Sequence, residues 1–324
     1  MAGLSSSITV APTTDNLTTK TNTSAKKGSV FFWLPGTHPA SRRQPAQAGV
    51  AAYDERVATA NIEGITISYD DRGDQAGTPV VLIHGHPFNR GMWGPQVADL
   101  TAAGYRVVTP DLRGYGETSV VPGVTMLEVF AGDLAGLMDH LGLDRVVLGG
   151  LSMGGQIVME FYRQFPGRVA ALVLADTFAA ADTPEGRAAR NATADRMLAE
   201  GMDGYAAEVI GKMIAPYNVT AQPEVAEHVL GMMRGTAPEG AAAALRGRAQ
   251  RRDYRDLLAQ VSVPALVVVG TDDEYTPVGD AEYMHERIPD STLAVIDGAA
   301  HMPNLERPAE FNAALRKFLA RQAP

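Results

Sequence analysis

The stretch from Gly149 to Gly155 reads G-G-L-S-M-G-G and directly follows the apolar run 146–148. Glycine two positions before a serine and two positions after it is the pattern G-x-S-x-G, a sharp turn from a strand into a helix. The glycines are needed because the incoming strand and the outgoing helix crowd the serine. Residues 156–162 are predicted to be helical, so Ser152 is a candidate nucleophile. A tight turn that only packs a helix on a sheet would also favour glycine.

A nucleophilic serine needs a base, a group that orients the base, and donors for the oxyanion. After such a turn the acid and then the histidine are expected in chain order. The predicted strand 264–270 is followed by Asp272 and Asp273, and the predicted strand 292–296 by a loop that holds His301. The carboxyl ends of parallel strands meet at one edge of a sheet. We therefore expect Ser152, an acid near position 273 and His301 to meet in space.

The other histidines give weaker signals. His140 and His285 lie in helical patterns, His38 lies in an irregular N-terminal region, and His228 fits either a surface or a pocket. The chain has no cysteine and no histidine pair with zinc-site spacing, so no metal site is predicted.

Five motifs follow one another along the chain: H-G-H-P (84–87), D-L-R-G-Y-G-E-T-S (111–119), G-L-S-M-G-G (150–155), G-T-D-D-E-Y-T-P (270–277) and G-A-A-H-M-P-N-L-E-R-P (298–308). Together they resemble the α/β-hydrolase superfamily, within the group similar to 3-oxoadipate enol-lactonases and related bacterial esterases. The resemblance covers about residues 58–322.

The resemblance implies Ser152 as nucleophile, Asp273 as acid and His301 as base. Asp273 is preferred to Asp272 by the G-x-x-D spacing and the proline four residues later, and Asp176 is the reserve acid at the end of another strand. A serine at position 152 argues against dehalogenase and epoxide hydrolase chemistry, which uses Asp there.

The strand 80–83 ends in His-Gly, and this implies an oxyanion hole formed by the backbone amides of His86 and Met153. His84 is expected to brace the loop. The side chains of His86, Trp93 and Met302 are expected to line the substrate pocket. No metal or organic cofactor is expected.

The predicted fold is the α/β-hydrolase fold, in class α/β, with a mostly parallel central sheet and helices on both faces. The core is predicted over 58–176 and 262–324, with a helical cap over 177–261 inserted after the sixth strand. Residues 62–67 read as an edge hairpin. A capping box is predicted at Thr125–Glu128, before a helix with apolar positions Val129, Phe130, Leu134, Leu137 and Leu141.

The cap region is predicted to be helical, with helix starts at Thr183-Pro184-Glu185 and Gln222-Pro223-Glu224. Its methionines are candidates for an apolar pocket lining or for ordinary core: Met202, Met213, Met232 and Met233. Residues 1–57 are expected to be a disordered N-terminal extension without a signal peptide.

A net charge of −9 argues against nucleic acid and anionic membranes as partners. The absence of cysteine fits a cytoplasmic protein. The oligomeric state stays open.

The predicted function is a serine hydrolase that acts on a small-molecule carboxylic ester or lactone. The same triad also serves perhydrolase or haloperoxidase chemistry, acyl transfer, C–C bond hydrolysis, and the tailoring of one large biosynthetic ester. A non-catalytic receptor on the hydrolase scaffold is a further alternative.

Overall fold

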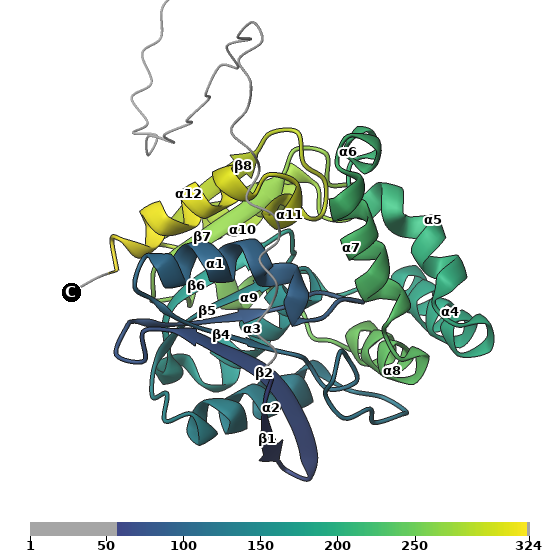
Figure 1. The fold of residues 1–324 in the computed structure, drawn as a ribbon, viewed down its shortest axis with the longest axis horizontal. Helices are drawn as coiled ribbons and strands as arrows, with labels where there is room; N and C mark the ends of the chain where they lie inside the picture. Colours follow the sequence, from purple (N-terminus) through teal and green to yellow (C-terminus); the bar gives the residue numbers. More distant parts are fainter. Residues whose placement is uncertain (1–56, 323–324) are drawn as a thin grey trace, which may run out of the picture. The chain divides into compact units, whose positions relative to one another are not determined.

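The computed structural model describes residues 57–322 (Figure 1). Its eight strands form a single sheet in the order β1-β2-β4-β3-β5-β6-β7-β8. The strand bounds are β1 Ala58–Ile62, β2 Ile65–Gly73, β3 Pro79–Ile83, β4 Arg106–Pro110, β5 Val146–Leu151, β6 Val169–Ala175, β7 Ala265–Gly270 and β8 Ser291–Ile296.

The first two strands form the antiparallel edge of this sheet. β1 pairs with β2 through the register Ile62↔Ile65, and β2 runs antiparallel to β4. In the turn between β1 and β2, Glu63 and Gly64 have positive φ angles. All later pairs are parallel. The predicted hairpin at the antiparallel edge and the mostly parallel sheet are confirmed.

Helices cover both faces of the sheet. The helices that pack in the core are η1 Arg90–Trp93, α1 Gly94–Ala102, α2 Leu127–His140, α3 Met153–Gln164, η2 Pro166–Arg168, α9 Arg255–Leu258, α10 Val278–Arg287, α11 Pro303–Glu306 and α12 Pro308–Leu319.

Alternation along the strands divides the apolar core between the two faces. In β5, Val146 and Leu148 join the cluster that contains the apolar side chains of α2, α3 and α10. Val147 and Leu151 point the other way, into the cluster with α1 and α12. Both faces of each central strand are therefore buried, which explains why these strands read as continuous apolar runs in the sequence.

Six helices lie between β6 and β7, and the first five of them form the cap, the green helices beside the sheet in Figure 1. They are α4 Pro184–Glu200, α5 Asp203–Met213, α6 Pro216–Ala221, α7 Pro223–Arg234 and α8 Pro238–Ala249. Each begins with a proline or acidic residue at its first position. The Thr183 hydroxyl accepts a hydrogen bond from the Gly186 amide and caps α4, as predicted. The predicted insertion of helices after the sixth strand is confirmed.

The predicted capping box at Thr125 is wrong. The helix α2 begins one residue later, with Met126 at the N-cap and no side-chain cap. Thr125 instead donates its backbone N–H to the Ala243 carbonyl of α8, because the cap packs on the core at this point. Val129 is exposed rather than buried, although Phe130 of the same predicted apolar stripe is buried.

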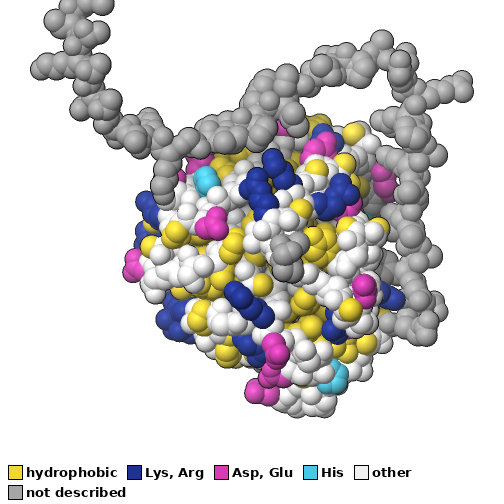
Figure 2. Space-filling view, turned by 90° about the vertical axis from the view of Figure 1, so that its left-hand side faces the viewer, with side chains coloured by type: hydrophobic (Ala, Val, Ile, Leu, Met, Phe, Trp, Pro, Cys, Tyr) yellow, Lys and Arg dark blue, Asp and Glu magenta, His cyan; other side chains and the backbone are white. Residues whose placement is uncertain are grey.

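The surface shown in Figure 2 mixes Lys and Arg side chains with Asp and Glu side chains rather than separating the two signs. Within residues 57–322, no helix is both long and apolar enough to cross a membrane. The prediction of a disordered extension concerns residues that lie outside the described ones, apart from Val57.

The docking of the cap on the core leads to a stability prediction. A Cβ at Gly247 of α8 would lie 1.7 Å from the Thr125 carbonyl oxygen, so Gly247→Ala forces α8 away from the core. We expect a loss of about 1–3 kcal/mol in the free energy of unfolding, measured by urea denaturation. Gly231→Ala in α7 is the matched control, because a Cβ there meets nothing within 4 Å.

The control is expected to be neutral or to stabilise the protein by about 0.5–1 kcal/mol, since alanine favours a helix over glycine. Equal effects of the two substitutions would contradict the close packing of α8 on residue 125.

Candidate active site

Ser152 lies at the turn between β5 and α3, with φ 57° and ψ −116°. This positive φ is strained for a residue with a side chain and persists only where the surroundings hold it. The Ser152 amide donates to the Ala175 carbonyl at 2.9 Å, and its carbonyl accepts from the Thr177 hydroxyl at 2.7 Å. A Cβ at Gly154 would lie 2.2 Å from the Ile83 carbonyl oxygen, so this position requires glycine. The predicted strand–turn–helix geometry is present.

His301 and Asp273 form a buried pair. The His301 Nδ1 lies 2.7 Å from Asp273 Oδ2, and both side chains are almost fully buried. Asp273 also accepts hydrogen bonds from the backbone amides of Tyr275 and Thr276 and from the Thr276 hydroxyl. Burial alone would raise the pKa of Asp273, but the His301 ring and the Thr276 hydrogen bonds lower it on balance. Asp273 is therefore held as a carboxylate against the histidine.

The two alternative acids, Asp176 and Asp272, make other contacts. Asp176 follows β6 at φ 44° and accepts a hydrogen bond from the Gly270 amide at 3.0 Å. Burial, followed by the charge of Asp273, raises the pKa of Asp176 well above its ordinary value, which favours its protonated form. Asp272 is exposed and accepts a hydrogen bond from the Tyr217 hydroxyl. Of the three acids, Asp273 is the one in hydrogen-bond contact with His301.

Asp176, Asp273 and His301 bring their ligand-type atoms within 4.8 Å of one another, an arrangement that also suits a metal ion. The hydrogen bond between His301 Nδ1 and Asp273, however, already uses one ligand atom of each residue.

The loop after β3 carries His84 and His86. His84 is fully buried; its Nδ1 lies 2.8 Å from the Gly85 carbonyl oxygen, and its Nε2 accepts from the Leu112 amide at 2.9 Å. This side chain thus ties the loop to the one after β4, the bracing role expected for it. Neither the His86 amide nor the Met153 amide has a hydrogen-bond partner among residues 57–322. Both are available to donate to an oxyanion.

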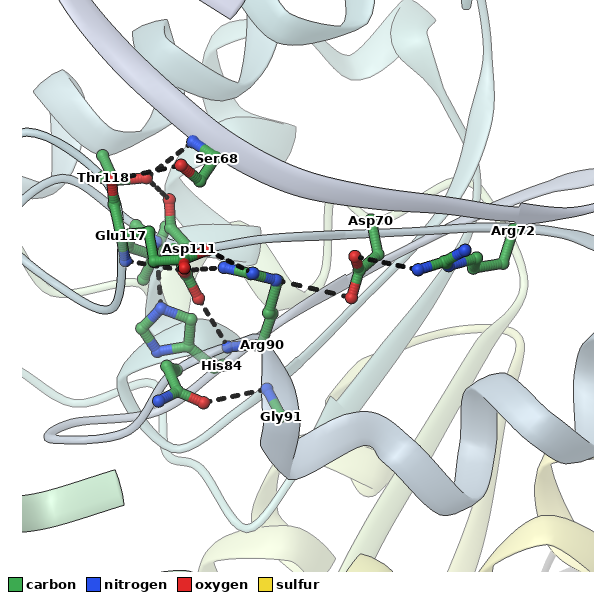
Figure 3. A network of polar contacts seen from close by, with 11 residues as sticks. Ser68, Asp70, Arg72, His84, Arg90, Gly91, Asp111, Glu117 and Thr118 are labelled. Carbon is green, nitrogen blue, oxygen red and sulfur yellow. Dashed lines mark hydrogen bonds and ion pairs between the residues drawn. The ribbon is translucent and has the colours of Figure 1, made fainter. Parts of the chain in front are cut away.

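A network of charged side chains joins the loop after β3 to the loop after β4 (Figure 3). Asp111 accepts from the Arg90 amide at 2.8 Å and from the Glu117 amide at 2.9 Å, and it pairs with the Arg90 guanidinium. Arg90 also contacts Asp70 of β2 at 3.4 Å. The motif at 111–119 therefore acts as a scaffold for the loop that carries His86.

A cavity of about 400 Å³ opens over Ser152 and His301. Within the described part of the chain, the Ser152 hydroxyl makes no hydrogen bond, and Ser152 lines the cavity. The cap supplies most of the wall. The lining side chains besides Ser152 and His301 are His86, Phe178, Asp182, Gly186, Ala189, Arg190, Thr193, Arg196, Tyr205, Glu208, Val209, Met213, Leu245, Arg248, Tyr275 and Thr276.

His86 lines the cavity as expected, but two other expected lining residues do not. Trp93 is fully buried and packs against Phe311 at a ring distance of 6.2 Å. Met302 is also fully buried, in the same apolar cluster. Trp93 and Met302 point into the core, because η1 and α11 pack against α1 and α12. The expectation of pocket roles for Trp93 and Met302 is wrong.

The four cap methionines were expected to line the pocket or to be ordinary core residues, and both cases occur. Met213 lines the cavity, and Met202, Met232 and Met233 are core residues. His228 lies outside the cavity, with its Nε2 3.1 Å from the Gly91 carbonyl oxygen.

Sequence reasoning did not identify the charged side chains of the cavity, Asp182, Arg190, Arg196, Glu208 and Arg248. They lie on or beside α4, α5 and α8, where no motif marks them. The packing of the cap helices against one another decides that these residues line the cavity.

Comparison with known proteins finds one family and several relatives that match most of the chain. Residues 78–308 match a family described as the alpha/beta hydrolase fold. The chain is 30% identical to 3-oxoadipate enol-lactonase 1 of Acinetobacter baylyi over 78% of this chain and 92% of that protein. It is 31% identical to a putative non-heme chloroperoxidase of Synechocystis over 80% and 96% of the two chains.

Two solved structures are similar over most of the chain. A thermophilic esterase of Thermogutta terrifontis, solved with malate bound, has a TM-score of 0.80 and 40% identity, covering 83% of this chain and all of its own. The enol-lactonase of Burkholderia xenovorans LB400 has a TM-score of 0.76 and 28% identity, covering 81% and 100%.

The raised pKa of Asp176 predicts how stability depends on pH. An unfolded Asp loses its proton near pH 4, whereas folded Asp176 keeps it to higher pH, so this group lowers stability as pH rises from about 4 to its folded pKa. Asp176→Asn removes the effect and keeps an acceptor for the Gly270 amide. We expect the Tm of the variant, relative to the wild type, to increase between pH 4.5 and pH 7.5.

Asp272→Asn serves as the control, since it removes an exposed carboxylate one residue from Asp273 and leaves Asp176 in place. A Tm difference for Asp176→Asn that stays constant over this pH range would contradict a protonated Asp176.

Proposed function

The chain belongs to the α/β-hydrolase fold family, and on that premise we propose that it is a serine hydrolase that cleaves a carboxylic ester or lactone through an acyl-enzyme. Its resemblance to enol-lactonases and bacterial esterases, inferred from five motifs, agrees with the relatives found. The observation that carries the mechanism is the 2.7 Å contact between His301 Nδ1 and Asp273, beside a cavity that Ser152 also lines.

In the proposed first step, Ser152 Oγ attacks the ester carbonyl and His301 removes its proton. Because Nδ1 is hydrogen-bonded to Asp273, Nε2 is the ring nitrogen left to act as the base. The Asp273 carboxylate holds the imidazole in this tautomer and stabilises the imidazolium that forms. His301 then returns the proton to the leaving alkoxide.

The amides of His86 and Met153 are proposed to bind the oxyanion of the tetrahedral intermediate. One comes from the loop after β3 and the other from the first residue of α3, and removal of one such donor typically costs about 3–4 kcal/mol of transition-state stabilisation. Water, with His301 as base, then hydrolyses the acyl-enzyme. The partner implied is a small-molecule ester or lactone; the cytoplasmic location stays a prediction.

A second candidate reaction uses the same acyl-enzyme with hydrogen peroxide in place of water, which releases a peracid. The 31% identity to a putative non-heme chloroperoxidase favours testing it. Incubation of the protein with acetate and peroxide, with oxidation of a halide as the readout, distinguishes the two reactions.

The nucleophile is tested by a panel of p-nitrophenyl esters of increasing chain length and small lactones. We expect the wild type to hydrolyse at least one of them and Ser152→Ala to lose about 10⁴-fold or more in kcat. A fluorophosphonate probe is expected to label the wild type and not Ser152→Ala. A wild type that neither reacts with the probe nor cleaves any ester or lactone would overturn the proposal.

The acid is tested with a matched pair of isosteric substitutions. Asp273→Asn is expected to lower kcat by about 10⁴-fold, because the amide favours the wrong imidazole tautomer. Asp176→Asn changes a carboxyl whose pKa is raised and which does not contact His301, and this variant is expected to stay within a few fold of the wild type. The reverse ranking of the two variants would assign the acid to Asp176.

A further inference from the structure

The cavity wall contains more guanidinium groups than carboxylates to balance them. Asp182 is shared by two arginines: its Oδ2 lies 2.6 Å from Arg190 Nε and 2.6 Å from Arg251 Nη1. Arg196 and Glu208 form their own pair at 2.8 Å. These ion pairs use both carboxylates that line the cavity.

Arg248 is left without a counter-ion. Its side chain is almost fully buried, and within residues 57–322 it forms no ion pair. The one hydrogen bond of its guanidinium joins Nε to Gln156 Oε1 at 3.0 Å. Its two terminal nitrogens have no protein partner among these residues, and they are not among the buried polar atoms sealed from solvent. Since Arg248 lines the cavity, these nitrogens are available to a molecule inside it.

The surroundings of Arg248 destabilise its charge. Burial, followed by the charges of Arg190 and Arg251, lowers the pKa of Arg248 from its ordinary value. A guanidinium nevertheless stays protonated in proteins. An unpaired buried cation is costly unless an anion approaches it, so the site gains stability when an anion binds.

His86 also lines this cavity. Its Nδ1 lies 2.8 Å from the Tyr115 hydroxyl oxygen, and its Nε2 is buried without a partner in the described chain. Burial, followed by the positive charges of Arg248 and Arg190, lowers the pKa of His86 well below its ordinary value, so the ring is neutral. The ring therefore adds no positive charge to the cavity, which leaves the Arg248 guanidinium as the unpaired charged group of its wall.

The position of Arg248 relative to the nucleophile is set by Gln156. The Gln156 amide donates to the Ser152 carbonyl at 3.2 Å, so Gln156 lies one turn further along α3. Four residues advance a helix by about 6 Å. The guanidinium that Gln156 holds therefore stands within the span of a small molecule from the Ser152 hydroxyl.

We propose that Arg248 forms a carboxylate-binding subsite, and that the substrate is a small ester or lactone that also carries a carboxylate a few bonds from the scissile carbonyl. The subsite rests on the proposed function for its reaction and on the unpaired guanidinium for its specificity. A planar guanidinium matches the two oxygens of a carboxylate, and a cavity of about 400 Å³ suits a small substrate.

Binding is tested first, without turnover, by calorimetric titration of glutarate into Ser152→Ala protein. Glutarate is expected to bind, and the added substitution Arg248→Met is expected to weaken binding at least about tenfold, the effect of losing a charge-assisted hydrogen bond in a buried site. Arg246→Met is the matched control on the same helix: Arg246 pairs with Asp195 outside the cavity, and its loss is expected to leave glutarate binding unchanged.

Turnover is tested with monomethyl glutarate and its neutral isostere methyl 5-methylhexanoate, each followed by pH-stat. Arg248→Met is expected to lower kcat/KM for the charged ester at least tenfold and for the neutral ester less than threefold. Arg248→Lys keeps a charge but loses the planar fork, and an intermediate loss is expected. Should Arg248→Met fail to fold, the same comparison is made with Arg248→Lys.

The outcomes separate this proposal from the previous one. A wild type that hydrolyses no ester but binds glutarate through Arg248 would refute the proposed reaction and support the carboxylate-binding subsite. Glutarate binding unchanged by both Arg248 substitutions, or an equal loss for both methyl esters, would overturn the subsite. Inorganic phosphate that binds as tightly as glutarate would overturn its assignment to carboxylates.

Discussion

The site depends on the close approach of three backbones at the turn around Ser152. A side chain at Gly154 would collide with the Ile83 carbonyl, and one at Gly150 would lie 2.4 Å from the Gly154 carbonyl. Because no side chain separates them, the end of β3 lies directly against the start of α3. The amides of His86 and Met153, which come from these two segments, are thereby held in the same region as the nucleophile. Backbone packing thus sets the proposed catalytic geometry more than any side-chain contact does.

Two carboxyl groups lie beside each other below this turn, and their surroundings give them different charges. Asp273 accepts several hydrogen bonds and faces His301, and its pKa is lowered. Asp176 is buried beside that charge, and its pKa is raised. Two adjacent carboxylates are costly in a buried site, so the pKa of one of them is raised. This division makes Asp273 the acid best suited to orient the histidine.

The charge of the cavity differs from that of the chain as a whole. The protein carries a net charge of −9, and the face in Figure 2 mixes both signs. The cap nevertheless turns Arg190 and Arg248 inward over Ser152, with Asp182 shared among the arginines. The core provides the groups of the proposed reaction, whereas the cap provides an electrostatic preference among substrates. The two properties are carried by separate segments of the chain and can change independently.

The sequence by itself determined the fold family and the turn at Ser152. It also determined that an acid near position 273 pairs with His301. These features are local: glycine spacing, apolar runs and polar residues at strand ends each follow from backbone geometry over a few residues. It did not determine the start of α2, the burial of Trp93 and Met302, or the cluster around Arg248. Those were decided by tertiary packing, because the direction of a helical side chain depends on which face of its helix meets a neighbour, and the cap helices carry no motif that fixes that face.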